Sequence, residues 1–226
     1  SVKFVYIIVN RFKHMENVVK NFNLIKQEII DKKKVKLVAV TKTFPISHIL
    51  PVINEGHTDF GENKVQEAME KWTSIKQDFP KINLHLIGKL QTNKVKFVLP
   101  LFDYIHSLDN VKLANKLAEE QNKKNFKPKI FIQVNIGEEN QKSGINKNEL
   151  NNLVIYCKNI GLDVVGLMCI PPINSDPNDH FKEMSVLNKD YNFKELSMGM
   201  SSDYLKAIKN NATYLRIGSN IFGERF

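Results

Sequence analysis

Lys42 is the residue whose type and position most clearly indicate chemistry in this sequence. It follows the short apolar run Val35–Thr41 and precedes Thr43-Phe44-Pro45, where a turn leading into a helix is predicted. A lysine there stands at the carboxyl end of a buried strand, where α/β barrels and open sheets place their functional groups. In a pocket with little water the neutral amine becomes available and can form a Schiff base with an aldehyde. The alternative is a lysine whose ammonium group simply extends into solvent.

Two later loops have the composition of phosphate sites. Residues 197–202, Ser-Met-Gly-Met-Ser-Ser, follow a predicted strand, and residues 216–219, Arg-Ile-Gly-Ser, end the last one. The glycines allow close backbone approach, and Ser201 or Ser202 supplies a hydroxyl group and a helix cap. Loops after the seventh and eighth strands of a barrel often bind phosphate. Each loop alone fits ordinary helix capping, but both loops facing Lys42 predict a phosphorylated aldehyde such as pyridoxal phosphate.

Strand-like and helix-like segments alternate along the chain and would position these groups. The predicted strands span residues 35–41, 58–61, 84–88, 102–106, 129–136, 162–168, 195–197 and 213–217. Helical patterns separate them, and an amphipathic helix with Val18, Phe22, Ile25 and Ile29 on one stripe precedes them. The alternation predicts an α/β protein, a single (β/α)8 TIM barrel with an extra N-terminal helix. The alternative is an open doubly wound sheet, although no Gly-x-Gly-x-x-Gly follows the first strand.

The predicted strand ends converge on one surface. Besides Lys42 and the two loops, they contribute Glu62, Asn63, Asn135 and Met168. His85 lies within a strand, and a histidine there is more often a hydrogen-bonded core residue than a ligand contact.

Composition limits the possible partners. The chain has 226 residues, enough for one sizeable core, and no linker divides it. Its net charge of +9 suggests nucleic acid, but of 33 basic residues only Arg11, Arg216 and Arg225 are arginine. Base recognition relies on the planar fork of arginine, so we expect no nucleic-acid partner. Where arginine is scarce, Arg216 at a strand end is a candidate for a task that lysine cannot perform.

Neither end of the chain nor the cysteines suggest export or metal binding. The apolar stretch Val2–Val9 is too short to span a bilayer and no cleavage pattern follows it, so we expect a cytoplasmic protein without a membrane partner. Cys157 and Cys169 lack metal-ligand spacing and are expected to be reduced core residues. Met15 opens a good helical pattern, so residues 1–14 are expected to be an extension and residues 15–226 the barrel domain.

Several motifs together resemble those of the pyridoxal-phosphate homeostasis proteins, from about Met15 to the C-terminus. They are residues 38–43 (VAVTKT), 60–68 (FGENKVQEA), 85–88 (HLIG) with 91–94 (QTNK), 133–136 (QVNI) with 142–144 (KSG), 166–171 (GLMCIP), 196–201 (LSMGMS), and 215–219 (LRIGS) with 221–223 (IFG). The resemblance implies a barrel like the N-terminal domain of alanine racemase. It also implies pyridoxal phosphate held as a Schiff base on Lys42.

By the same resemblance, the cofactor-binding residues are Lys42, Asn63, Met168, Ser201, Arg216, Gly218 and Ser219. Ser201, Gly218 and Ser219 match phosphate-binding positions, and Arg216 matches the residue beside the pyridine nitrogen. A permanent cation there would keep that nitrogen unprotonated and weaken the cofactor as an electron sink. Asn63 and Met168 match residues that line the pocket.

The resemblance favours a carrier or buffer of the cofactor over an enzyme. Racemases resembling this barrel complete their site with a tyrosine from a second, β-rich domain of a partner subunit, and only ten residues follow Arg216. We therefore expect no catalytic residues, no metal, a monomer or weak dimer, and PLP-dependent apoenzymes as possible recipients. Two alternatives stay open: an amino-acid racemase of low activity, and a basic barrel that binds other phosphate ligands.

Overall fold

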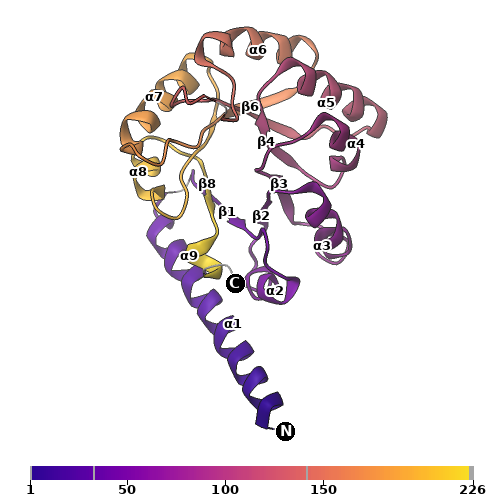
Figure 1. Ribbon diagram of the computed structural model, residues 1–226, viewed down its shortest axis with the longest axis vertical. Helices are drawn as coiled ribbons and strands as arrows, with labels where there is room; N and C mark the ends of the chain where they lie inside the picture. The colour runs from indigo at the N-terminus through magenta and orange to yellow at the C-terminus, as the bar shows by residue number, and fades with distance from the viewer. Residues whose placement is uncertain (1, 33, 141, 224–226) are drawn as a thin grey trace.

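Eight parallel strands close into a barrel in chain order, from β1 beside β2 to β8 beside β1 (Figure 1). This is seen in a computed structural model that describes residues 2–32, 34–140 and 142–223. The strands are β1 Lys36–Val40, β2 Asp59–Glu62, β3 Asn83–Leu86, β4 Tyr104–Leu108, β5 Lys129–Gln133, β6 Asp163–Met168, β7 Glu195–Ser197 and β8 Tyr214–Ile217. The predicted TIM barrel is therefore confirmed, and the open sheet is excluded.

Helices form the outer layer of the barrel, as Figure 1 shows. They are α1 Val2–Ile29, α2 Ile46–Asn54, α3 Val65–Asp78, α4 Val95–Val98, α5 Val111–Lys124, α6 Lys147–Asn159, α7 Pro177–Asp190, α8 Tyr204–Lys209 and α9 Ser219–Phe222, with a 3-10 turn at Thr92–Lys94 before α4. No described helix is long and apolar enough to cross a membrane.

The extra N-terminal helix is longer than the sequence pattern predicts. It begins at Val2 rather than at Met15 and runs without a break to Ile29, and its N-terminal half projects beyond the barrel (Figure 1). Its C-terminal half packs against α2 and α9 and buries the predicted apolar stripe that includes Val18 and Phe22. The amphipathic pattern therefore marks the part of the helix that packs on the barrel, not the helix boundary.

Strand β1 shows how the barrel divides its side chains. Leu37 and Ala39 pack in the large cluster outside the barrel, whereas Val38 belongs to a small cluster inside it. Successive side chains of a strand point to opposite faces. Val40 and Lys42 therefore continue the inward set, and Lys42 is directed over the carboxyl end of the barrel.

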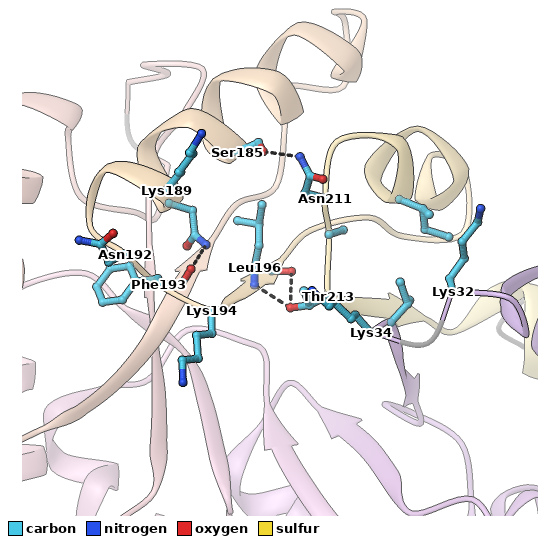
Figure 2. A pocket seen from close by; sticks show the side chains of 14 residues that line it. Lys32, Lys34, Ser185, Lys189, Asn192, Phe193, Lys194, Leu196, Asn211 and Thr213 are labelled. Carbon is cyan, nitrogen blue, oxygen red and sulfur yellow. Dashed lines mark hydrogen bonds between the residues drawn. The ribbon is translucent and has the colours of Figure 1, made fainter.

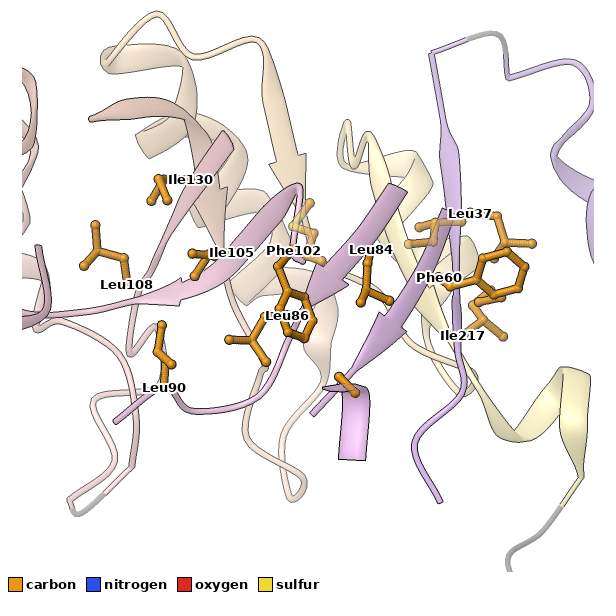
Figure 3. Close-up of a cluster of buried hydrophobic side chains, with 14 of the residues drawn as sticks. Leu37, Phe60, Leu84, Leu86, Leu90, Phe102, Ile105, Leu108, Ile130 and Ile217 are labelled. Atoms are coloured by element: carbon orange, nitrogen blue, oxygen red, sulfur yellow. The ribbon is translucent and has the colours of Figure 1, made fainter. Parts of the chain in front are cut away.

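The main hydrophobic core lies between the strands and the surrounding helices. Figure 3 shows part of it, with Leu84 and Leu86 of β3, Ile105 and Leu108 of β4 and Phe60 of β2. All five side chains are completely buried. Both faces of each strand are thus covered, which explains why the strands read as apolar runs in the sequence.

One local expectation from the sequence is not met, namely that Asp109 could cap the helix that follows the fourth strand. Asp109 does not cap α5: the N-cap is Asn110, whose side chain accepts a hydrogen bond from the Leu113 N–H at 2.9 Å. The Asp109 carboxylate instead accepts from the Gly144 N–H at 3.0 Å. Both residue types are good caps, so local sequence could not choose between neighbours. Pro51 is the sixth residue of α2 and is buried.

Candidate functional site

A pocket of about 600 Å³ opens at the carboxyl ends of β1 and β8. Five of the seven predicted binding residues line it: Lys42, Ser201, Arg216, Gly218 and Ser219. The remaining lining residues are Val40, Phe44, Ile87, Met200, Ser202 and Gly223. This volume is typical of small-molecule sites, and the lining combines apolar walls with a few polar groups. The structure therefore gathers an amine, a guanidinium group and two serine loops in one cavity.

The pairing of β1 with β8 places Lys42 and Arg216 on the same wall. Val38 is the register partner of Arg216, so Arg216 lies deeper in the barrel than Lys42. Gly218 sits next to Val40, and a side chain at Gly218 would come within 3.1 Å of the Val40 carbonyl oxygen. Glycine at this position therefore allows the two strand ends to approach each other closely beside the pocket.

Arg216 is a buried cation at the base of the pocket. Only 3% of the residue's surface is exposed to solvent. Nη1 donates to Ser197 Oγ at 2.6 Å, and Nη2 donates to the Cys169 carbonyl oxygen at 2.9 Å. Burial lowers the pKa of its guanidinium group, yet an arginine keeps its charge at neutral pH. Both of its partners are uncharged, so its charge is available to an electron-rich ligand.

The two serine loops are joined by Asn220. Its backbone N–H donates to Ser201 Oγ at 3.3 Å, and its side-chain Nδ2 donates to the Ser201 carbonyl oxygen at 2.9 Å. Because Ser201 Oγ accepts this bond, its own O–H can donate into the pocket. The backbone N–H groups of Ser202 and Ser219 donate to no other group in the described chain. The loops thus present several donors of the kind that bind a phosphate.

In the loop of residues 197–202, the predicted helix cap by a serine and the predicted approach of Gly199 to a ligand are both replaced by other roles. Neither Ser201 nor Ser202 caps α8, whose N-cap is Asp203. Gly199 has φ +98°, and a Cβ atom there would lie 2.6 Å from the Cβ of Ala207 in α8. The close approach that requires glycine is therefore to a helix of the protein itself. Sequence alone could not distinguish this packing from an approach to a ligand.

Asn63 and Met168 lie outside the lining of this pocket. Asn63 follows β2, and its backbone oxygen occupies the space that a side chain at Gly88 would need. Met168 is fully buried in the cluster inside the barrel, with Val38 and Phe131. Glu62, which the strand-end pattern also assigned to this surface, points outward to α3, because it alternates with the inward-facing Gly61.

Ile87 and Asn220 are the main site residues that sequence reasoning missed. Ile87 follows β3 and so satisfies the same strand-end rule that identified Lys42. It was overlooked because an aliphatic side chain carries no chemistry of its own. Asn220 gave no signal, since its contribution depends on the fold bringing residues 201 and 220 together.

A chain of hydrogen bonds runs from Arg216 through the inside of the barrel. One direction of donation satisfies every contact: Ser197 Oγ donates to His106 Nδ1 at 2.8 Å, and His106 Nε2 donates to His85 Nδ1 at 2.9 Å. His85 Nε2 then donates to Asp59 Oδ1 at 2.9 Å. Burial would raise the pKa of Asp59, but the bond from His85 lowers it overall. His85 is therefore a hydrogen-bonded core residue, as predicted, and both histidines are neutral.

We expect stability to fall as the pH falls below 6.5, because His57, His85 and His106 are buried in the neutral form. Burial lowers the pKa of all three, in His57 to about 4. The unfolded chain therefore binds more protons between pH 6.5 and 4 than the native one. Each histidine adds a slope of up to about 1.4 kcal/mol per pH unit, with stability lost toward acid.

Urea unfolding at steps from pH 7.5 to 4.5 measures this slope. His57→Gln should lower this slope by up to about 1.4 kcal/mol per pH unit, because it removes one of the three buried titratable groups. A free energy of unfolding that stays constant from pH 7 to pH 5 would contradict the assignment of three neutral histidines.

A second cavity, of about 770 Å³, lies at the opposite end of the barrel, beside the amino ends of β7 and β8 (Figure 2). Lysine side chains surround it, including Lys32, Lys34 and Lys194. Two of its three lining amides are engaged: Asn211 Nδ2 donates to Ser185 Oγ at 2.9 Å, and Asn188 Nδ2 donates to the Phe193 carbonyl oxygen at 3.2 Å. This end of a TIM barrel serves stability rather than chemistry. We therefore assign the candidate site to the smaller cavity at Lys42.

Comparison with known families places the whole barrel in one group. Residues 14–225 match the model of the alanine racemase N-terminal domain. The chain is 36% identical over 228 residues to the pyridoxal phosphate homeostasis protein of Haemophilus influenzae, covering 92% of this chain and 96% of that protein. It is 40% identical over 204 residues to the protein of the same name from Synechocystis, covering 84% and 92%.

Solved structures agree with this grouping. PipY of Synechococcus elongatus, with PLP bound, superposes with a TM-score of 0.84 at 29% identity, over 91% of this chain and all of PipY. Alanine racemase of Clostridium difficile gives a TM-score of 0.73 at 14% identity, over 93% of this chain and 57% of the racemase. At that identity the racemase shows a shared fold alone.

Proposed function

Since the chain belongs to the alanine racemase N-terminal-domain family and, within it, to the pyridoxal phosphate homeostasis proteins, we propose that it binds pyridoxal 5'-phosphate and takes part in vitamin B6 homeostasis. The observation that carries the proposal is the meeting of Lys42, the buried cation of Arg216 and two donor-rich serine loops in one pocket. The binding of PLP by PipY supports it.

The residues of the pocket fit the chemical groups of this cofactor. Ser201 and Ser219, with the backbone N–H groups of their loops, suit a phosphate dianion. Arg216 suits an unprotonated ring nitrogen, because a buried cation without a carboxylate partner favours an acceptor. Ile87 and Phe44 supply apolar walls for an aromatic ring. The bound cofactor would supply an aldehyde and a conjugated ring.

Lys42 is the proposed attachment point. Its Nζ would add to the aldehyde carbon, and the aldehyde oxygen would leave as water, so that a carbon–nitrogen double bond links protein and ligand. We also propose that Asn63 and Met168 contribute to cofactor binding indirectly, since neither lines the pocket. We further propose that the protein acts in the cytoplasm as a carrier or buffer, with PLP-dependent apoenzymes as recipients and as a monomer or weak dimer.

Replacing both Ser201 and Ser219 with alanine should weaken retention of the cofactor. Each hydroxyl is expected to give a charge-assisted hydrogen bond to the phosphate worth roughly 1.5–3 kcal/mol. Together they predict a loss of affinity on the order of 100-fold or more. Equilibrium dialysis with PLP measures it, and the linkage to Lys42 should still form at high cofactor concentration.

Ser175→Ala is a matched control, because Ser175 is exposed and lies outside the pocket. It should bind PLP like the parent protein. A double variant that retains the cofactor as tightly as this control would place the phosphate elsewhere.

A further inference from the structure

Lys71 of α3 is buried directly behind the turn that carries Lys42. Its Nζ donates to two carbonyl oxygens of that turn, those of Thr41 and Phe44, both at 2.8 Å. It also lies 2.8 Å from Glu62 Oε1 and 3.0 Å from Glu67 Oε1. The ammonium group thus bridges two carboxylates and both ends of the turn.

The two carboxylates bind the same turn themselves. Thr41 Oγ1 donates to Glu62 Oε1 at 2.7 Å, and the Thr43 N–H donates to Glu67 Oε1 at 2.5 Å. The turn of residues 41–44 is therefore bound at four points by side chains of β2 and α3. Lys42 lies in the middle of this segment and faces the pocket on its other side.

The turn has a backbone conformation that needs such support. Thr43 has φ +68°, in the left-handed region that β-branched residues rarely adopt. A residue in this region is strained, and the conformation persists only where the surrounding structure determines it. Without the bonds to Lys71 and Glu67, the turn would be free to relax and would move Lys42.

Stability alone does not account for the cluster. Glu62 is completely buried, and its Oε2 has no hydrogen-bond partner among the described residues. A buried ion pair often contributes no more stability than apolar side chains of similar size. The pair is better explained by what it holds in place.

We propose that Lys71, with Glu62 and Glu67, is a positioning clamp that fixes the turn of Lys42 and so aims its amine into the pocket. None of the three residues lines the pocket. Their role in cofactor capture rests on the proposed function, whereas their hold on the turn does not.

Lys76 provides a matched control on the same helix. It also pairs with a carboxylate and a backbone carbonyl, Asp103 Oδ2 at 2.6 Å and Leu101 O at 2.9 Å. Its side chain is similarly shielded, 18% exposed against 10% for Lys71. Lys71→Met and Lys76→Met therefore remove interactions of the same kind, two carboxylate and two carbonyl contacts against one of each, but only the first touches the turn of Lys42.

The test measures two quantities on wild type and both variants. The first is hydrogen–deuterium exchange of the peptide covering residues 41–46 in the cofactor-free protein. The second is the dissociation constant for PLP. We expect Lys71→Met to speed exchange at least tenfold and to weaken binding at least tenfold, while Lys76→Met matches wild type in both.

Equal exchange at residues 41–46 in the two variants would overturn the clamp. If Lys71→Met does not fold, Glu67→Gln is measured in the same two ways. This substitution weakens the hydrogen bond that Glu67 accepts from the Thr43 N–H, and the Glu67 side chain is partly exposed, so the variant is expected to fold. Should wild type bind no PLP, the proposed function fails, and the exchange measurement still decides whether the clamp exists.

Discussion

Replacing Lys42 with alanine is expected to abolish the visible absorbance band that forms when PLP is added to the protein. The band requires a carbon–nitrogen double bond conjugated with the ring, and Lys42 is the lysine in the described pocket lining. PLP should still bind weakly through its phosphate, because Ser201 and Ser219 remain. A spectrophotometric titration with PLP measures both the band and the residual affinity.

Lys89→Ala is a suitable control for this loss. Lys89 is exposed, follows β3 at the same end of the barrel and lies outside the pocket lining. Its variant should give the full band. A Lys42→Ala protein that keeps an undiminished band would show that another lysine forms the linkage.

We also expect the PLP-loaded protein to show no racemase turnover at a rate typical of a metabolic enzyme. Racemisation removes a proton on one face of the substrate and returns it on the other, so it needs two acid–base groups. The described lining of the pocket contains Lys42, but no tyrosine, histidine or carboxylate. Arg216 would in addition limit the delocalisation of negative charge into the ring. We therefore expect binding of amino acids to the loaded protein at most.

The measurement is conversion of L-alanine and other common amino acids to their D-forms by the PLP-loaded protein, followed by chiral chromatography. Turnover on the order of 1 s⁻¹ or faster lies in the ordinary range of enzymes. If it occurs and is lost in Lys42→Ala, the low-activity racemase becomes the better account. Steep salt dependence of ligand binding without a visible band would instead favour the general phosphate-binding barrel.

The barrel could be predicted from the sequence because both faces of each strand are covered. Strands such as Lys129–Gln133 therefore read as apolar runs between amphipathic helices. Strand limits were less accurate: β4 begins at Tyr104 rather than at Phe102, which packs in the outer cluster before the strand starts. The apolar pattern of the sequence indicates which residues are buried, and buried residues extend beyond the last hydrogen-bonded pair of a strand.

The site could be predicted where a rule of the fold applies to single residues. Lys42 and Arg216 were found because the ends of strands form one surface and because Arg216 is one of few arginines. The prediction that Glu62 faces the pocket is wrong, because neighbouring residues of a strand point to opposite faces and the inward-facing residue here is Gly61. Lys71 gave no signal at all, because its partners Thr41 and Phe44 lie 30 and 27 residues away.

Reduction of the PLP-loaded wild-type protein with borohydride, followed by peptide mapping, tests the central claim most directly. Borohydride adds hydride to the carbon of the double bond, water supplies the proton to nitrogen, and the ligand becomes permanently attached. We predict that the label is recovered on the peptide containing Lys42, at one equivalent per chain. Label on a different lysine, or no label after reduction of a PLP-saturated sample, would contradict the account.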